Sequence, residues 1–302
     1  MNNTTNLFNS VWVPGTLSKA KNLPVIVFIH GGGYVSGSSS GFSGTDTFDG
    51  DDLIHEAGGG VVAVTIQYRL GVFGFLAGQK VKDDGALNVG LLDQQFALRW
   101  IQQYISKFGG DPKKVTIWGE SAGAGSVLQQ VIANGGKTTP PLFRGAISSS
   151  SFLPSQYKFN DPIPEKIYDS LVSMTGCSPS NDTLACLRTA DSNFLDTANV
   201  NITLNGFFGT FVTVPVIDGT FITESPTELF KQRKVNGEFL LAVTNTFEGA
   251  LFVDSNTAST VTIQDYVTQL FPHFGSREIT ATVAQYQGLG APIDQAIAIM
   301  GE

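Results

Sequence analysis

The chain has 302 residues, of which 42% are hydrophobic and 15% are charged, and its formal net charge is −8. This composition is typical of a globular protein and excludes a disordered chain. The basic clusters are short, as in "KQRK" at residues 231–234, so nucleic acid is not an expected partner. No apolar run reaches the roughly 18 residues that a membrane-spanning helix needs, so no transmembrane segment is expected.

Several apolar runs have the length and the β-branched content of strands. They lie at residues 25–30, 61–70, 114–119, 144–150 and 239–245. Most are apolar on both faces, which is typical of parallel strands covered by helices on both sides of the sheet. The sequence therefore predicts an α/β fold, with one domain over residues 1–302.

The clearest helix is predicted between Asn88, its expected N-cap, and Gly109, its expected stop. Large apolar side chains recur along it every four residues, at Leu92, Phe96, Trp100, Tyr104 and Phe108. Residues 151–236 are expected to form short helices and loops, as an insertion above the sheet where a substrate pocket would lie.

The pattern Gly-x-Ser-x-Gly occurs twice, centred on Ser39 and on Ser121. Ser39 lies in the Gly/Ser-rich run "SGSSSG", which reads as a loop. Ser121 follows the predicted strand "KVTIWG" and opens the helical stretch "SAGAGSVLQQVIA". A serine at such a strand-to-helix corner has an exposed hydroxyl, so Ser121 is the candidate nucleophile and Ser39 is not.

The run "HGGGYVSG" begins at His30, just after the first predicted strand. If Ser121 is a nucleophile, the amides of Gly32, Gly33 and Ala122 would form an oxyanion hole for acyl transfer. The alternative for these glycines is a plain tight turn. His30 is expected to orient the loop and not to act as the base.

A nucleophilic serine also needs a base and a carboxylate that holds the base. Glu248, in "TNTFEG", follows the last predicted strand and is the candidate acid, although it could equally be a solvated turn residue. No metal site is expected, because two cysteines without nearby histidines cannot bind zinc.

Cys177 and Cys186 are nine positions apart, and this spacing is compatible with two free thiols or with one disulfide. A separate, weak pointer towards secretion is the Asn-x-Thr sequon. Four such sequons begin at Asn2, Asn3, Asn181 and Asn201.

Six blocks together resemble the type-B carboxylesterase and lipase family, which includes cholinesterases and fungal lipases. They are "PVIVFIHGGGYVSGS", "VAVTIQYRLGVFGFL", "NVGLLDQQFALRWIQQYISKFGGDPKKVTIWGESAGAGSV", "FRGAISSSS", "PVIDG" and "TNTFEG". The resemblance runs from about Val11 to the end of the chain. It implies an α/β-hydrolase fold with a mostly parallel central sheet and helices on both faces.

The resemblance also implies a secreted carboxylic ester hydrolase that acts on a small-molecule or lipid ester through an acyl-enzyme and needs no cofactor. In this reading Ser121 is the nucleophile, Glu248 the triad acid, and Gly32, Gly33 and Ala122 supply the oxyanion amides. Cys177 and Cys186 would form the family's small disulfide.

Two departures from the family pattern set further expectations. Phe247 precedes Glu248, where the family often has an acidic residue. The family's catalytic histidine lies in a C-terminal segment that has no counterpart here, since His273 resembles a turn between two helices and His55 a helix residue. We therefore expect a chain truncated at both ends and inactive alone.

Two alternatives belong to other functional classes. A non-catalytic adhesion or scaffold protein, or an inactive truncated product, would have the same fold. Nucleotide binding is disfavoured, because "GESAGAGS" lacks the G-x-G-x-x-G spacing and no basic group is placed for phosphate.

Overall fold

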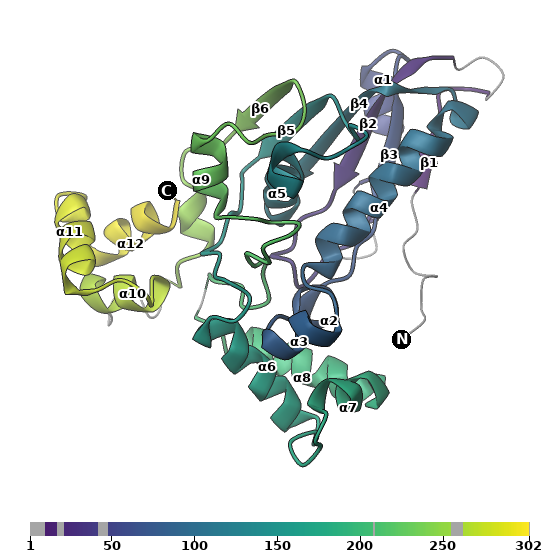
Figure 1. The fold of residues 1–302 in the computed structure, drawn as a ribbon. Helices are drawn as coiled ribbons and strands as arrows, with labels where there is room; N and C mark the ends of the chain where they lie inside the picture. Colours follow the sequence, from purple (N-terminus) through teal and green to yellow (C-terminus); the bar gives the residue numbers. More distant parts are fainter. Residues whose placement is uncertain (1–9, 17–20, 42–47, 208, 255–261, 302) are drawn as a thin grey trace. The chain divides into compact units, whose positions relative to one another are not determined.

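The computed structural model describes residues 10–16, 21–41, 48–207, 209–254 and 262–301 (Figure 1). These residues form two compact units. The sheet unit comprises residues 1–203 and 213–243, and the helical unit comprises residues 204–212 and 244–302. Whether residues 1–302 act as one domain stays a prediction.

A six-stranded sheet with the strand order β1-β3-β2-β4-β5-β6 forms the centre of the sheet unit. Its strands are β1 (Ser10–Trp12), β2 (Leu23–Ile29), β3 (Val62–Ile66), β4 (Gly110–Glu120), β5 (Gly145–Ser149) and β6 (Phe239–Val243). β1 pairs with β3 in antiparallel fashion, and every other pair is parallel. The predicted strands are all present, and the mostly parallel α/β fold is confirmed.

The strands β2 and β3 are largely buried on both faces, as their apolar sequences predicted. All five residues of β3 are buried, and Val27 of β2 lies between Val64 of β3 and Ile117 of β4. The edge strand β6 differs, because all five of its residues are exposed, with Leu241 at 54%.

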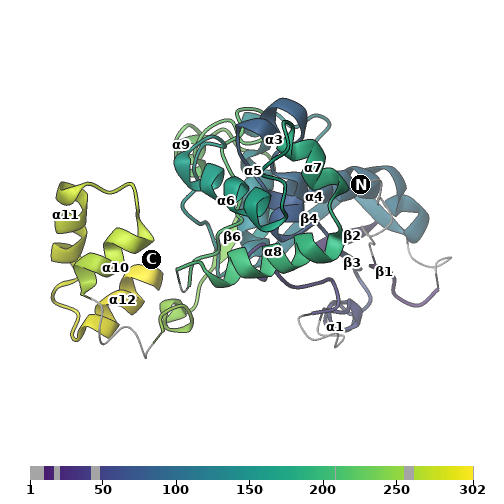
Figure 2. The ribbon, with the colours of Figure 1, turned by 90° about the horizontal axis from the view of Figure 1, so that it is seen from below.

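The helices of the sheet unit lie on both faces of the sheet, as expected. α4 (Val89–Tyr104) and α5 (Ala122–Gly136) pack against each other and against β4, and α1 (Asp51–Glu56) packs against β3. Figure 2 shows α1 on the opposite side of the sheet from α4 and α5. The further helices are α2 (Gly71–Phe75), α3 (Gln79–Asp84), η2 (Ile105–Phe108), α6 (Pro162–Met174), α7 (Thr183–Thr189), α8 (Ser192–Leu204) and α9 (Pro226–Lys231).

The buried face of α4 is not the apolar stripe that predicted the helix. Leu91, Leu98 and Ile101 are fully buried, whereas Phe96 is 65% exposed. Side chains spaced four apart drift by about 40° per step around a helix of 3.6 residues per turn, so a long stripe of this kind leaves the core.

Asn88 does precede α4, but its side chain does not cap the helix. The residue has a left-handed backbone with φ of 53°, and its amide donates to the backbone oxygen of Val216 and to the carboxylate of Asp218. The amide therefore ties the start of α4 to residues 216–218. Gly109, with φ of 85°, ends the following 3-10 turn as predicted.

The insertion between β5 and β6 contains α6, α7, α8 and α9, in agreement with the expected short helices. Cys177 and Cys186 form a disulfide with a Cα–Cα distance of 5.7 Å. This bond joins the segment after α6 to α7, which is the pairing that the family resemblance implied.

The helical unit has its own apolar core. Its elements are η3 (Glu248–Leu251), α10 (Ile263–Leu270), α11 (Ser276–Tyr286) and α12 (Pro292–Gly301). The buried residues of this core are Val253, Ile263, Tyr266, Val267, Ala296 and Ile299.

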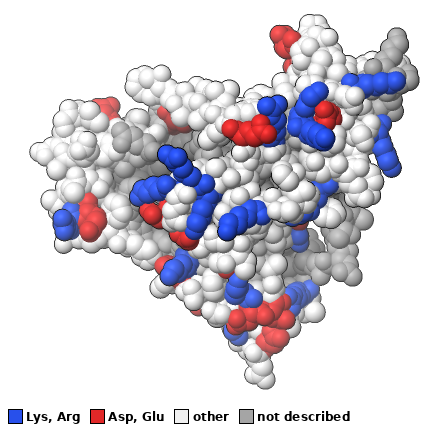
Figure 3. Space-filling view, turned by 45° about the horizontal axis from the view of Figure 1, so that its top comes forward, with Lys and Arg blue, Asp and Glu red and all other residues white. Residues whose placement is uncertain are grey.

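The surface is weakly charged. On the face in Figure 3, acidic and basic side chains are interspersed among a majority of uncharged ones. Within the described part of the chain, no helix has the length and hydropathy to cross a membrane.

Candidate active site

Ser121 occupies the single residue between the end of β4 and the start of α5 (Figure 1). Its backbone, with φ of 56° and ψ of −123°, lies outside the regions that L-residues ordinarily adopt. Such a conformation costs on the order of 1–3 kcal/mol and persists only where the surroundings impose it. A strained serine at a strand-to-helix corner is the geometry that the motif around Ser121 predicted.

Backbone hydrogen bonds hold Ser121 in this conformation. Its N–H donates to the carbonyl of Ser149 on the neighbouring strand β5 at 3.1 Å. Its own carbonyl accepts from the N–H groups of Gly125 at 2.9 Å and Phe152 at 3.1 Å. The side chain makes no capping bond to α5, so the hydroxyl is not used to begin the helix.

The two glycines of the motif allow α5 to approach the sheet. A Cβ atom on Gly123 would lie 2.0 Å from the carbonyl oxygen of Ile29 in β2, and one on Gly119 would lie 2.3 Å from the backbone of Gly123. Any side chain at these positions would force the helix away from the strands, and the turn at Ser121 would open.

The glycine loop after β2 lies directly beside this turn. A Cβ atom on Gly31 would lie 3.0 Å from Cβ of Ser121 and 2.7 Å from the carbonyl oxygen of Glu120. Gly32 has φ of +102°, and its carbonyl accepts from the N–H groups of Val35 and Ser36. The structure therefore brings the predicted loop and Ser121 together within the sheet unit.

The predicted oxyanion amides are those of Gly32, Gly33 and Ala122. In the described ranges of the chain, none of these three N–H groups donates a hydrogen bond to the protein. Ala122 is also the first residue of α5, where backbone N–H groups carry partial positive charge.

His30 packs between the glycine loop and Tyr68. The ring is fully buried, its Nδ1 lies 2.9 Å from the carbonyl oxygen of Gly31, and it stacks on Tyr68 with 4.5 Å between ring centroids. Tyr68 in turn donates its hydroxyl to the carbonyl of His30 at 2.8 Å. Burial lowers the pKa of His30, so the ring is neutral and acts as a spacer under the loop.

Tyr68 is a supporting residue that the sequence analysis missed. Burial raises the pKa of its phenol well above the ordinary value, so the hydroxyl stays protonated and can only donate to His30. Its place in "IQYRLG", directly after β3, was the available signal, because the ends of neighbouring parallel strands meet at one edge of a sheet.

The other two histidines are exposed. His55 is on α1, with 89% of its side chain exposed, and His273 is exposed in the turn between α10 and α11. Both agree with the sequence-based interpretation. Ser39 also lies in a loop, next to a turn in which Ser38 Oγ donates to the carbonyl of Gly41 at 2.7 Å.

Glu248 begins the 3-10 turn η3 in the helical unit and is partly buried. Its Oε1 accepts from the backbone N–H of Asn245 at 2.5 Å and from the Asn245 amide at 3.2 Å. Two donors on one oxygen hold the carboxylate in a fixed orientation. Its role as the triad acid stays a prediction.

Residues 5–295 match the model of the carboxylesterase family. The chain is 37% identical to "Lipase 5" of Diutina rugosa over 96% of its own length and 54% of that protein. It is also 37% identical to "Secreted lipase 1" of Botryotinia fuckeliana, over 86% of this chain and 46% of that one. The chain thus spans about half the length of the curated relatives it matches.

Among solved structures, the crystal structure of Aspergillus niger EstA matches with a TM-score of 0.81 and 32% identity. The match covers 97% of this chain and 57% of that one. The likeness therefore extends over nearly all of this chain.

Proposed function

Because the chain belongs to the carboxylesterase family, we propose that the protein hydrolyses carboxylic esters with Ser121 as the nucleophile. The observation that carries the proposal is the strained backbone of Ser121 beside the glycine loop that follows β2. No metal or organic cofactor has a part in this reaction.

In the proposed reaction, Ser121 Oγ attacks the ester carbonyl carbon and its proton passes to a general base. The carbonyl oxygen becomes an oxyanion and accepts hydrogen bonds from the three amides. The base then protonates the leaving alcohol, which departs to give an acyl-enzyme. Water repeats the sequence on the acyl-enzyme and releases the acid.

The proposal assigns Glu248 to hold the base, in the chain order of serine, acid and histidine. It assigns the base to none of the three histidines of residues 1–302. His30 is buried and neutral under the loop, while His55 and His273 are exposed. We therefore propose that residues 1–302 alone lack ordinary esterase turnover and retain at most a residual catalysis of about 10³–10⁴-fold over water, from the oxyanion amides and substrate binding.

The proposed substrates are small-molecule or lipid esters, since the relatives above are named lipases. A secreted relative is the reason to propose an extracellular location for the protein.

Hydrolysis of p-nitrophenyl butyrate tests both parts of this proposal. In a longer form of the protein that is active, Ser121→Ala should abolish turnover and the matched control Ser39→Ala should leave it nearly unchanged. The reverse result would overturn the assignment of Ser121. For residues 1–302, His273→Ala should leave the residual rate of hydrolysis unchanged. Ordinary esterase turnover that is lost in both Ser121→Ala and His273→Ala would show that this chain has a complete triad.

A further inference from the structure

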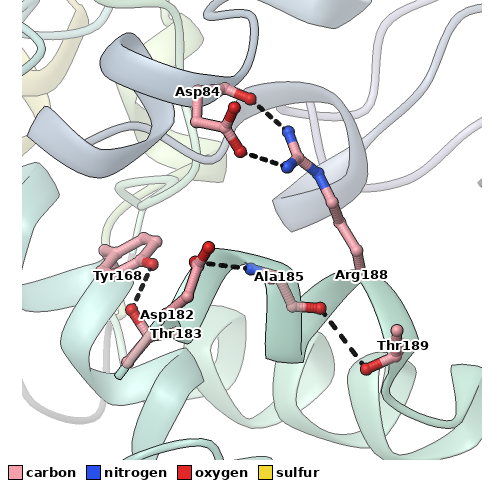
Figure 4. Close-up of polar contacts among 7 residues, drawn as sticks. All are labelled: Asp84, Tyr168, Asp182, Thr183, Ala185, Arg188 and Thr189. Carbon is pink, nitrogen blue, oxygen red and sulfur yellow. Dashed lines mark hydrogen bonds and ion pairs between the residues drawn. The ribbon is translucent and has the colours of Figure 1, made fainter. Parts of the chain in front are cut away.

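The sequon that begins at Asn181 lies on the surface of the sheet unit. Asn181 is exposed, in a bend between the two cysteines of the disulfide, and the helix α7 begins two residues later at Thr183. The Asp182 side chain accepts from the N–H of Ala185 at 2.9 Å, and the Thr183 hydroxyl meets the hydroxyl of Tyr168 at 2.7 Å (Figure 4). These contacts fix Asp182 and Thr183 while Asn181 faces solvent.

The sequon at Asn201 has a different setting. It lies inside α8, where residues two apart do not face each other, so the Asn201 amide and the Thr203 hydroxyl point to different sides of the helix. That hydroxyl donates to the carbonyl of Asn199 at 2.9 Å. An asparagine whose amide and i+2 hydroxyl are held apart is a poor acceptor for a glycan, whereas Asn181 precedes its helix and is not held by helical geometry.

A shallow hollow of about 260 Å³ adjoins Asn181. It is lined by Lys80, Asp83, Asp84, Asn181, Asp182 and Leu184. One carboxylate of its wall is fixed, because Arg188 of α7 reaches across to α3 and donates to the Asp84 carboxylate at 2.5 Å and to the Asp84 backbone oxygen (Figure 4).

The lining suits a single sugar ring. Carboxylates accept hydrogen bonds from sugar hydroxyls, a lysine donates to an N-acetyl carbonyl, and Leu184 offers an apolar contact to the ring face. Because Asn181 is itself part of the lining, a sugar linked to it would begin beside these groups.

We propose that Asn181 carries an N-linked glycan and that its first N-acetylglucosamine occupies this hollow. In the transfer step, the Asn181 amide nitrogen bonds to C1 of the sugar of a polyprenyl-diphosphate-linked oligosaccharide. The bond from C1 to the diphosphate oxygen breaks, the diphosphate leaves with its electron pair, and the amide loses one proton. The inference rests on the proposed secretion, because this co-reactant is met only in the secretory pathway.

The test is secretion of the full 302-residue chain from yeast behind an added secretion signal, so that neither ester hydrolysis nor the native route of export affects the result. Deglycosylation with peptide N-glycosidase F in ¹⁸O-water, followed by peptide mapping, identifies each occupied sequon. We expect ¹⁸O-labelled aspartate at position 181 and unmodified Asn201. Unmodified Asn181 in secreted protein, or a glycan on Asn201 alone, would overturn the proposal.

A second measurement tests the place of the first sugar. Endoglycosidase H leaves one N-acetylglucosamine on the asparagine, so the trimmed protein should melt about 2–4 °C above Asn181→Gln, the shift expected for roughly 1 kcal/mol in a unit of this size. The conservative variant Thr183→Ser keeps the sequon and should keep the higher Tm. A glycan on Asn181 with the same Tm in the trimmed protein and in Asn181→Gln would refute the seating in the hollow.

Discussion

Replacement of Gly123 by alanine tests whether close contact between α5 and β2 creates the turn at Ser121. The new methyl group would lie 2.0 Å from the Ile29 oxygen, 2.8 Å from the His30 oxygen and 2.9 Å from the His30 carbonyl carbon. All three are backbone atoms and cannot rotate away. Overpacking typically costs 1–3 kcal/mol, and alanine regains about 1 kcal/mol of helix propensity.

We expect a net loss of about 2–3 kcal/mol in the free energy of unfolding, because a contact of 2.0 Å exceeds ordinary overpacking. Gly219→Ala is the matched control: Gly219 has φ of +77° but nothing within 4 Å, so only the left-handed backbone should cost about 1–2 kcal/mol. Urea unfolding followed by tryptophan fluorescence measures both, since Trp12, Trp100 and Trp118 are all in the sheet unit. A Gly123→Ala variant no less stable than Gly219→Ala would refute the reasoning.

Three further predictions concern stability. Ser121→Gly should be more stable than Ser121→Ala by about 1 kcal/mol in urea unfolding, because only glycine relieves the strain at this backbone position; equal stability would mean that the turn is unstrained. Replacement of both Cys177 and Cys186 by serine should lower the free energy of unfolding by about 2–3 kcal/mol in the chain-entropy model. In the unchanged secreted protein, non-reducing peptide maps should show the two cysteines joined and resistant to alkylation. Asp93→Asn should lower the free energy of unfolding by about 2–3 kcal/mol, because it breaks the bidentate ion pair with Arg69. The loss should be smaller than for a fully buried pair, since Asp93 is 5% exposed but Arg69 is half exposed. An unchanged urea midpoint would contradict this prediction.

The sequence predicted the sheet because strands such as β2 and β3 are largely buried on both faces and are therefore mostly apolar. It did not predict β1, since the three residues "SVW" are too short for a periodic signal, and it did not predict the exposure of β6, which depends on what lies next to the edge of the sheet. The prediction that Asn88 caps α4 is wrong for its side chain, because an asparagine can serve as a cap or as a long-range anchor and the sequence does not distinguish the two.

At the candidate site, the sequence predicted features that have a local motif better than features that depend on tertiary contacts. The turn at Ser121 and the glycine loop each follow a strand in the sequence, so their meeting could be predicted from parallel topology alone. The position of Tyr68 after β3 was a signal that it lies at this edge of the sheet, but its ring stack on His30 depends on tertiary packing. The role of Glu248 depends on tertiary placement and on a histidine that sequence patterns do not identify among residues 1–302.

The strand order has a consequence for how the chain folds during synthesis. Val25 of β2 pairs with Val115 of β4, 90 positions later in the chain. At about 5–20 residues per second, β4 leaves the ribosome roughly 5–20 s after β2. Throughout this interval the apolar run of β2 lacks its partner on that side and can pair with other chains. The turn at Ser121 follows β4, so the strained residue is set in place only after β4 has been made and can pair with β2. Expression yield should therefore depend more on holding β2 apart from other chains than on the stability of the finished sheet.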